Sequence, residues 1–313
     1  MRRTGDLFPL VLERGNLLEA FCKASRGKRG RPDQRAFEAN LDAEIERLRA
    51  GLAAGNYPVG RYTRFRIFDP KEREICAASF GERVLHHALM NVCAPEFERR
   101  LSEDSFACRK GKGQTGALQR ASEWCRRRAW FMKGDIRKCF DSIPHVGLAR
   151  MLERVFKDRE ILWWFVRITG THEREPGKGL PIGNLTSQWL ANLYLAPLDR
   201  LGGAMVRYMD DCLFFGKDKE ELLERRRAAE EVVEGLGLTF KSRMCPMPTR
   251  GGVPFLGRRV HGWGAVPDRR SRQRFRRMEE AYAGRLVAGL WSQETYQRHI
   301  TALVSGQAVV GAG

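Results

Sequence analysis

Apolar positions in this chain recur at helical spacing over long stretches. Residues 1–56 have this spacing, apart from a Gly/Arg/Lys-rich connector at 25–31. From Asp33 onward the pattern predicts one amphipathic helix, whose apolar stripe consists of Phe37, Leu41, Ile45, Leu48 and Leu52. Helices are also expected over residues 81–101, 145–170 and 218–236, after the turn at 179–188, and across the last fifty residues.

Shorter segments have the composition and alternation of strands. Residues 61–68 and 71–78 flank an Asp-Pro turn and predict a hairpin. Single strands are expected at 130–136 and 238–241, and a hairpin arm at 253–260. Residues 206–215 are apolar on both sides of a turn, which predicts a largely buried hairpin. The mixture of helices and strands predicts an α+β fold.

The turn of the 206–215 hairpin carries two adjacent carboxylates, Asp210 and Asp211. Two unit charges about 4 Å apart repel by about 4 kcal/mol at an effective dielectric constant of about 20. A divalent cation between the carboxylates would remove that repulsion. The alternative is an ordinary solvated turn, because Asp is common in turns.

Charge is the most informative feature of the composition. The 313 residues include 56 Lys and Arg against 38 Asp and Glu, a formal net charge of +18. Such a field favours a polyanion, with nucleic acid ahead of an anionic membrane surface. No apolar run is long enough to span a bilayer, and no signal peptide or lipid-anchor motif is present, so we expect a cytoplasmic protein without membrane association. The eight cysteines are scattered, which indicates reduced thiols rather than a zinc site or disulfides.

A third carboxylate, Asp135, ends the predicted strand at 130–136, and the Gly-rich turn at 179–188 separates it from Asp210 and Asp211. Carboxylates from separate elements are what two-metal phosphoryl transfer requires, since they hold two cations that clamp the attacking and leaving oxygens.

Three basic segments are candidates for phosphate contacts. Lys71 and Arg73 lie two residues apart on one face of a strand, which suits a triphosphate or a solvated surface equally. The 106–115 loop contains Arg109 and Lys112 and lacks P-loop spacing, so a nucleic-acid backbone is the better expected ligand. The third segment is the predicted helix at 269–277, whose basic face lies opposite an apolar stripe. Such a helix suits the groove of a duplex better than a calmodulin-like or membrane-surface role. Its six arginines are Arg269, Arg270, Arg272, Arg274, Arg276 and Arg277.

These segments together resemble the reverse transcriptase family. Residues 208–211, Tyr-Met-Asp-Asp, are similar to the family signature, and the other blocks over roughly 60–260 follow in the family order. The resemblance implies a right-hand polymerase with an antiparallel palm sheet and helical terminal parts. The implied ranges are a helical extension at 1–60, fingers at 61–129, a palm at 130–265 with a helical insertion at about 147–178, and a helical thumb at 266–313.

The resemblance also implies catalytic roles. Asp135 and Asp210 would hold two Mg²⁺ ions, or Mn²⁺ in their place, with the carbonyl of Ile136 as a backbone ligand. Asp211 would assist electrostatically or as an intermittent ligand. Lys241 would protonate the leaving pyrophosphate, although a plain surface lysine is the alternative.

The implied substrate contacts come from several blocks. Lys71 and Arg73 would grip the triphosphate of the incoming dNTP. Phe140 would exclude a ribonucleotide 2′-hydroxyl, with a core aromatic as the alternative. The remaining implied contacts are Ile182, Gly183 and Gln188 for the nucleotide, Arg109 and Lys112 for the template, Phe255, Leu256 and Gly257 within a primer grip at 253–260, and the six arginines of the thumb for the duplex.

The Gly-rich turn suggests a subclass. Many reverse transcriptases place Gln before this glycine, whereas Ile182-Gly183-Asn-Leu-Thr-Ser187-Gln188 resembles enzymes of diversity-generating retroelements, which copy a template RNA with errors opposite adenine. Ile182 offers no hydrogen bond, and apolar contacts discriminate weakly, so we hypothesise that it loosens nucleotide selection.

The subclass resemblance implies a small, basic, oligomeric accessory protein as a partner, and a prokaryotic or phage cytoplasm as the location. The alternatives are a retron-like or group II intron-like reverse transcriptase and a non-catalytic RNA-binding scaffold. No RNase H, maturase, zinc or endonuclease block is seen after the thumb range, which favours the first interpretation over a group II enzyme.

Overall fold

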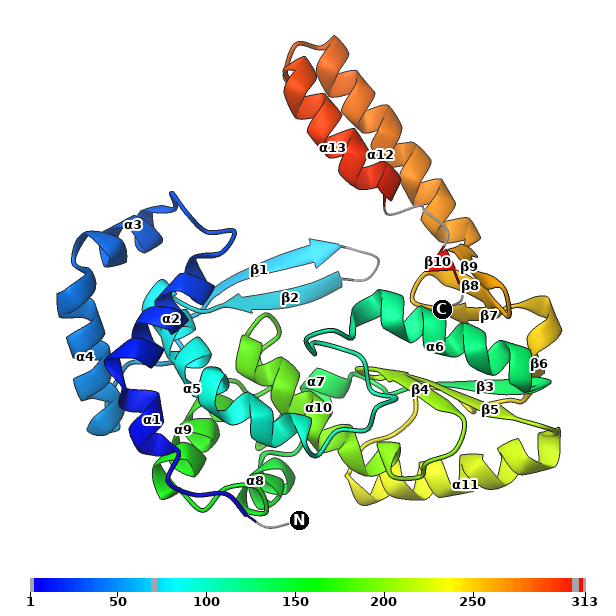
Figure 1. Ribbon diagram of the computed structural model, residues 1–313, viewed down its shortest axis with the longest axis horizontal. Coiled ribbons are helices and arrows are strands. Elements are labelled where there is room, and N and C mark those ends of the chain that lie inside the picture. The colour runs from blue at the N-terminus through cyan, green and yellow to red at the C-terminus, as the bar shows by residue number, and fades with distance from the viewer. Residues whose placement is uncertain (1–2, 69–71, 306–309, 312–313) are drawn as a thin grey trace. The chain divides into compact units, whose positions relative to one another are not determined.

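A computed structural model describes residues 3–68, 72–305 and 310–311 of the chain (Figure 1). The chain folds into two compact units, each assembled from separate segments. Unit 1 comprises Met1–Ser102, Ile136–Leu198 and Val232–Thr239, and unit 2 comprises Glu103–Asp135, Asp199–Glu231 and Phe240–Gly313. Both units mix helices with antiparallel strands, so the predicted α+β class is confirmed.

Unit 1 is mainly helical. Its helices are α1 (Phe8–Leu12), α2 (Arg14–Ser25), α3 (Pro32–Ala39), α4 (Leu41–Ala53), α5 (Phe80–Glu98), α7 (Cys139–Ser142), α8 (His145–Glu153), α9 (Arg159–Thr169) and nearly all of α10 (Leu185–Asp199). The core of this unit contains a cluster of aromatic rings with centroids 5.5–6.1 Å apart, formed by Phe97, Phe156, Phe165 and Trp189.

Two expectations for unit 1 need correction. The single amphipathic helix expected from Asp33 is two helices, because Asn40 (φ −123°, ψ 38°) leaves helical geometry between α3 and α4. The expected helix over 145–170 is likewise divided into α8 and α9. Apolar periodicity continues across both breaks, so periodicity alone does not reveal them.

The predicted hairpin at 61–78 is confirmed as β1 (Thr63–Phe68) and β2 (Glu72–Ala77), paired from Thr63↔Ala77 to Phe68↔Glu72. Arg73 is exposed on β2. Lys71 and the Asp-Pro turn lie outside the described residues.

Unit 2 contains a four-stranded antiparallel sheet in the order β4-β5-β3-β6. Helix α6 (Gly113–Arg127) lies on one side of this sheet and α11 (Lys219–Gly235) runs along the other (Figure 1). The strands are β3 (Trp130–Asp135), β4 (Met205–Tyr208), β5 (Asp211–Gly216) and β6 (Met247–Pro248). The predictions of a strand ending at Asp135 and of a hairpin across 206–215 are therefore confirmed.

The strand expected at 238–241 is wrong. The amide of Lys241 donates to the carbonyl of Asp135 at 2.8 Å, yet the strand that pairs with β3 is β6, further along the chain.

A second antiparallel sheet in unit 2 has the order β10-β9-β8-β7. Its strands are β7 (Val253–Phe255), β8 (Arg258–His261), β9 (Gly264–Pro267) and β10 (Val310–Gly311), with a 3₁₀ turn at Thr249–Gly251 before β7. Residues 253–260 thus form a complete hairpin rather than one arm. Helix α6 and both sheets share one apolar core, which includes Leu118, Phe131, Leu213, Phe215, Phe255 and Val260.

The chain then forms two helices, α12 (Arg269–Val287) and α13 (Gln293–Ser305), which pack on each other (Figure 1). Neither contains a buried residue. The prediction of an all-helical last fifty residues missed β9 and β10, which are too short to have a readable alternation.

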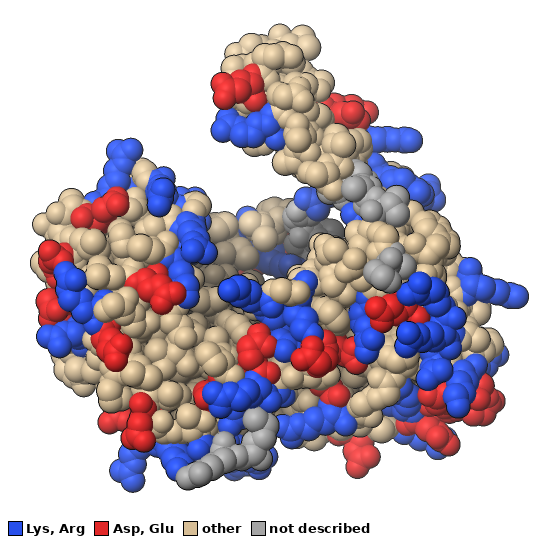
Figure 2. Space-filling model, viewed as in Figure 1, with Lys and Arg blue, Asp and Glu red and all other residues tan. Residues whose placement is uncertain are grey.

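The described surface agrees with the composition. Lys and Arg side chains are spread over the face drawn in Figure 2, with acidic side chains between them. Among the described helices, none has both the length and the apolar character needed to cross a bilayer. All eight cysteines are free thiols, as expected, although Cys22, Cys108 and Cys245 are exposed.

Candidate active site

The two carboxylates of the hairpin follow a strained turn. Tyr208 and Asp211 form the last register pair between β4 and β5, which leaves Met209 and Asp210 as the connecting residues. Met209 has φ of 56°, in the left-handed region that side-chain-bearing residues rarely adopt. Such a conformation costs about 1–3 kcal/mol and persists only where neighbouring contacts stabilise it.

Arg207 supplies that stabilisation from the interior. Its side chain is fully buried and forms a bidentate ion pair with Asp199, with Nε–Oδ1 at 2.5 Å and Nη2–Oδ2 at 2.6 Å. Nη1 donates to the carbonyl of Met209 at 3.1 Å, and Nη2 donates to Ser105 Oγ at 2.9 Å. The buried guanidinium of Arg207 thus joins the turn at Met209 to Asp199 and Ser105 in the interior of unit 2.

The third carboxylate lies beside the hairpin. β3 and β5 pair so that Asp135 is opposite Asp211, at the same end of the sheet as Asp210. The pKa of Asp211 is raised to about 6, mainly by burial and also by the neighbouring Asp210 and Asp135 charges, while Lys133 opposes the shift. The Oδ1 atom of Asp211 is buried without a hydrogen-bond partner. The structure thus brings the predicted acids to one place, and like charges there favour a cation.

Lys133 is the cation that the sequence analysis missed. Its Nζ donates to Asp211 Oδ2 at 2.8 Å and to the carbonyl of Pro254 at 3.4 Å, and it lies 5.9 Å from the ring centre of Phe255. Lys133 precedes Asp135 by two residues on β3, so both side chains lie on one face of the strand. That spacing was the available signal.

Lys241 approaches the same acids from another segment. Its Nζ is 3.8 Å from Asp135 Oδ2, and the side chain remains about half exposed. The structure therefore brings Lys241 next to Asp135, as the family order implied. Its role as a proton donor stays a prediction.

The donor chemistry of this cluster fits Mg²⁺. Hard carboxylate oxygens come from two neighbouring elements, and one of these oxygens is buried with no partner. Within the ranges that the structure describes, no three Asp, Glu, His or Cys side chains already converge closely enough to hold an ion. Asp211 Oδ2 and Asp135 Oδ2 instead face lysines, whereas Asp211 Oδ1 has no partner.

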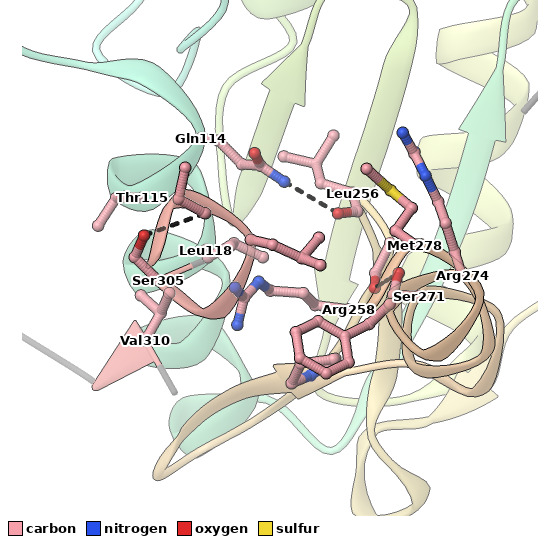
Figure 3. Close-up of a pocket in the computed structure, with 15 residues that line it drawn as sticks. Gln114, Thr115, Leu118, Leu256, Arg258, Ser271, Arg274, Met278, Ser305 and Val310 are labelled. Atoms are coloured by element: carbon pink, nitrogen blue, oxygen red, sulfur yellow. Dashed lines mark hydrogen bonds between the residues drawn. The ribbon is translucent and has the colours of Figure 1, made fainter. Parts of the chain in front are cut away.

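The predicted primer-grip residues form the β7–β8 turn. Leu256 (φ 49°) and Gly257 (φ 74°) both have positive φ, as a two-residue type I′ turn requires. Gln114 of α6 donates to the carbonyl of Leu256 at 3.0 Å, and Ser271 of α12 donates to that of Gly257 at 2.6 Å (Figure 3). The turn borders a pocket of about 600 Å³ that α6 and α12 also line.

Phe255 lies differently from the expectation. Its side chain is 1% exposed and belongs to the core, so it supports the turn from within and offers no surface to a primer. Leu256 is half-buried and Gly257 is exposed, and these two remain available.

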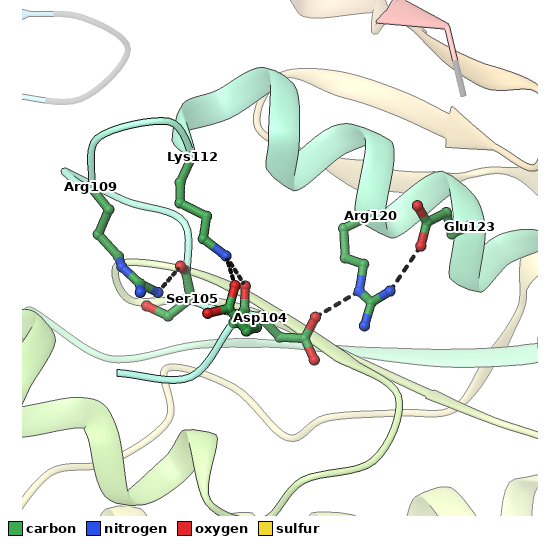
Figure 4. A network of polar contacts seen from close by, with 7 residues as sticks. Asp104, Ser105, Arg109, Lys112, Arg120 and Glu123 are labelled. Atoms are coloured by element: carbon green, nitrogen blue, oxygen red, sulfur yellow. Dashed lines mark hydrogen bonds and ion pairs between the residues drawn. The ribbon is translucent and has the colours of Figure 1, made fainter. Parts of the chain in front are cut away.

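Two cations of the basic loop at 106–115 contact the residues that directly precede the loop (Figure 4). Arg109 is 8% exposed and donates to the carbonyl of Ser105 at 2.7 Å, a position that does not support direct contact with a template. Lys112 pairs with the carboxylate of Glu103 and donates to its carbonyl at 2.8 Å. By contrast, the six arginines of α12 are all exposed.

The remaining predicted residues belong to unit 1. Ile136 is buried, and Phe140 on α7 is half-buried rather than enclosed in the core. The carbonyl of half-buried Ile182 accepts a hydrogen bond from the amide of Cys76 at 2.8 Å, which joins the Gly-rich turn to β2. A Cβ at Gly183 (φ 112°) would lie 3.0 Å from Ile75 Cγ2, so this close approach requires glycine. Gln188 is half-buried in the first turn of α10.

Comparison with known proteins gives a consistent result. The family model for reverse transcriptase (RNA-dependent DNA polymerase) matches residues 69–260. The group II intron-encoded protein LtrA of Lactococcus lactis subsp. cremoris is 25% identical over 168 residues, 51% of this chain and 28% of LtrA. An uncharacterised 91 kDa protein in the cob intron of Schizosaccharomyces pombe is 27% identical over 150 residues, 46% of this chain and 19% of that protein. This chain thus spans well under two thirds of the length of these curated relatives.

Among solved structures, telomerase from Candida tropicalis, in complex with a fragment of telomeric RNA, superposes with a TM-score of 0.50 at 12% identity. The superposition covers 78% of this chain and 52% of the telomerase chain. At that identity the likeness shows a shared fold.

Proposed function

This chain belongs to the reverse transcriptase family, and we propose on that basis that it synthesises DNA on an RNA template by adding dNTPs to a primer. The observation that carries the proposal is the register of β3 and β5, which sets Asp135 opposite Asp211 beside Asp210. The buried, unpartnered oxygen of Asp211 and its raised pKa support the same site.

The residues of unit 2 divide the work. Asp135, Asp210 and Asp211 would hold Mg²⁺, which supplies charge stabilisation for the attacking and leaving oxygens of the transferred phosphate. Lys133 neutralises Asp211 until the metal is bound. Lys241, beside Asp135, is placed to deliver a proton to the leaving pyrophosphate. Buried Arg207 keeps the turn in position, which matters because small displacements of reacting groups are costly.

Primer extension tests this proposal. The purified chain, a DNA primer on an RNA template, the four dNTPs and Mg²⁺ should yield extended DNA, and the Asp135→Asn variant should yield none. Glu224→Gln, an exposed acid on α11, is the matched control and should extend normally. Absence of product from the unmodified chain on several primed RNA templates would favour the RNA-binding scaffold.

We further propose that this polymerase serves a diversity-generating retroelement, together with a small basic accessory protein. The support is the Gly-rich turn, in which Ile182 stands where many reverse transcriptases place Gln. The intron-encoded relatives favour a second candidate, a group II intron-like reverse transcriptase. The two candidates differ in fidelity opposite adenine.

Sequencing the cDNA decides between them. The diversity-generating role predicts errors concentrated opposite template adenines and reduced in Ile182→Gln, whose backbone hydrogen bond to Cys76 is unaffected by the substitution. An even, low error rate in both proteins would favour the intron-like candidate.

A further inference from the structure

A second pocket in unit 2 is built around the β8–β9 turn. It has a volume of about 580 Å³ and is lined by Cys125, Ala129, Trp130, Pro248, Thr249, Arg250, His261, Gly262 and Trp263. None of these residues belongs to the carboxylate site or to the primer-grip turn. No Asp or Glu is among these described lining residues, while one arginine is.

The turn presents a flat aromatic surface. The rings of His261 and Trp263 lie 5.1 Å apart between centroids and are parallel within 4°. Trp263 is 63% exposed, which is unusual for so large an apolar side chain. The exposed indole is therefore open to one more planar group, with the imidazole stacked beneath it.

The stacked rings of His261 and Trp263, here called the platform, belong to a turn that α6 holds in place. His261 and Gly264 close the β8–β9 turn, and Ser122 of α6 donates to the carbonyl of His261. A Cβ at Gly262 would lie 2.7 Å from Arg126 Cγ, so the turn sits directly on the last turn of α6. A rigid aromatic surface loses little entropy when it binds a planar ligand.

Cations surround the platform. Arg250 lines the pocket and is exposed, and Arg126 is exposed beside Gly262. Trp130 also lines the pocket, and Lys219 Nζ lies 4.7 Å from the centre of its ring. Stacking rings with nearby cations are the combination that single-stranded nucleic acid requires, because each base has a π-face and each linkage a negative charge.

We propose that this pocket binds a single-stranded stretch of nucleic acid, with one base stacked on Trp263 and its phosphates near Arg250 and Arg126. The site is separate from the residues that carry the chemistry. It would hold template or product strand outside the duplex. A base inside a duplex has both faces covered by its stacked neighbours, so the central base of a single strand should reach the pocket and that of a duplex should not.

Photocrosslinking locates such a base directly. Ten-nucleotide RNA and DNA strands, each with one central 5-iodouracil, are irradiated with the full chain, and the adducts are mapped by mass spectrometry. The expected adduct lies on the peptide containing Trp263, and the RNA and DNA arms show which strand the pocket takes. A blunt duplex of the same sequence should give little adduct. Absence of an adduct at this peptide in both single-stranded arms would overturn the proposal.

Substitutions then measure the contribution of the ring. Trp263→Ala should weaken binding of the fluorescent ten-mers about tenfold or more, since one stacked base is lost. Trp263→Phe should recover most of the affinity, and Trp163→Ala, an exposed tryptophan of unit 1, should leave it unchanged. Arg250→Gln should lower the salt dependence of binding by about one ion, whereas Arg49→Gln should not. Equal affinity in Trp263→Ala and the unmodified chain would overturn the proposal and leave a protein partner as the better occupant.

The outcome is independent of the polymerase assay. A chain that crosslinks at Trp263 yet makes no cDNA would keep the pocket and remove the proposed function. A chain that makes cDNA without this adduct would keep the proposed function and remove the proposed nucleic-acid site at the pocket.

Discussion

The β4–β5 hairpin and the α12–α13 pair represent two extremes within unit 2. The hairpin is buried on both strands and tied down by Arg207, which is fully enclosed with its partner Asp199. The two helices contain no buried residue, and Val287 and Leu290 are 88% and 74% exposed. Buried contacts therefore fix the conformation of the hairpin, whereas the side chains of α12 and α13 are largely exposed to solvent.

The difference would suit the roles proposed for the two regions. Carboxylates that hold metal ions need positions fixed to a fraction of an ångström, so their supporting residues are enclosed. A helix that contacts the phosphates of a duplex needs charge and reach, and exposed arginines provide both without a core. Substitutions in the hairpin should therefore change chemistry or stability sharply, and substitutions in α12 should change affinity gradually.

The largest effect is expected from Asp210→Asn. Loss of one metal-binding carboxylate should reduce the rate of primer extension by about a thousandfold or more, because charge stabilisation at the reacting phosphate is lost. The measurement is the single-turnover extension rate, with circular dichroism to verify folding. A rate within tenfold of the unmodified chain would remove Asp210 from the chemistry.

Arg207→Met should be the most destabilising single substitution in the hairpin. It leaves Asp199 buried without its counter-ion, which costs about 3–5 kcal/mol of unfolding free energy. Arg49→Met breaks the exposed pair with Glu46 and should cost under about 1 kcal/mol. Urea unfolding compares the two, and equal costs would mean that burial does not matter here.

Metal-free stability should depend on pH through Asp211. Its pKa rises from 3.8 in the unfolded chain to about 6 in the fold, so its contribution to stability is complete below pH 3.8 and is lost as pH rises through 6. A difference of this size between the folded and unfolded pKa corresponds to about 3 kcal/mol of unfolding free energy. The side chain of the Asp211→Asn variant does not titrate. With a chelator present, the unfolding free energy of the variant should therefore increase relative to that of the unmodified chain as the pH rises from 4 to 7.5. A constant difference across that range would contradict the raised pKa.

The mildest effects belong to α12. Arg272→Gln and Arg276→Gln should each weaken binding of an RNA/DNA duplex slightly, and each should reduce the slope of log affinity against log salt by about one. Neither should change the urea midpoint, because both side chains are exposed. A change in stability without a change in slope would assign these arginines to packing.

The hairpin could be predicted because its signal is local. Apolar runs on both sides of Asp210 and Asp211 define two buried strands, and the strand that ends at Asp135 has the same clear pattern. Their pairing follows from the family order. The structure adds the register, which no local pattern contains.

What the sequence did not reveal depends on contacts between distant segments. The role of Arg207 depends on Asp199 and Ser105, and Arg109, which was expected to contact a template, is instead buried and bonded to the carbonyl of Ser105. The spacing of Lys133 and Asp135 places both on one face of a strand, but the contact of Lys133 with Asp211 depends on the pairing of β3 with β5. Short strands such as β6, β9 and β10 form through pairing, and their two to four residues are too few for periodicity to show.

The central claim is that acids from β3 and the β4–β5 turn form one metal site. Titration with Mn²⁺, followed by electron paramagnetic resonance, tests it in Asp135→Asn, Asp210→Asn and the double variant. One shared site predicts that each single substitution weakens Mn²⁺ binding strongly and that the double variant is little worse than either. Fully additive losses, or undiminished Mn²⁺ binding in Asp135→Asn, would show that these carboxylates do not act together and would contradict the account.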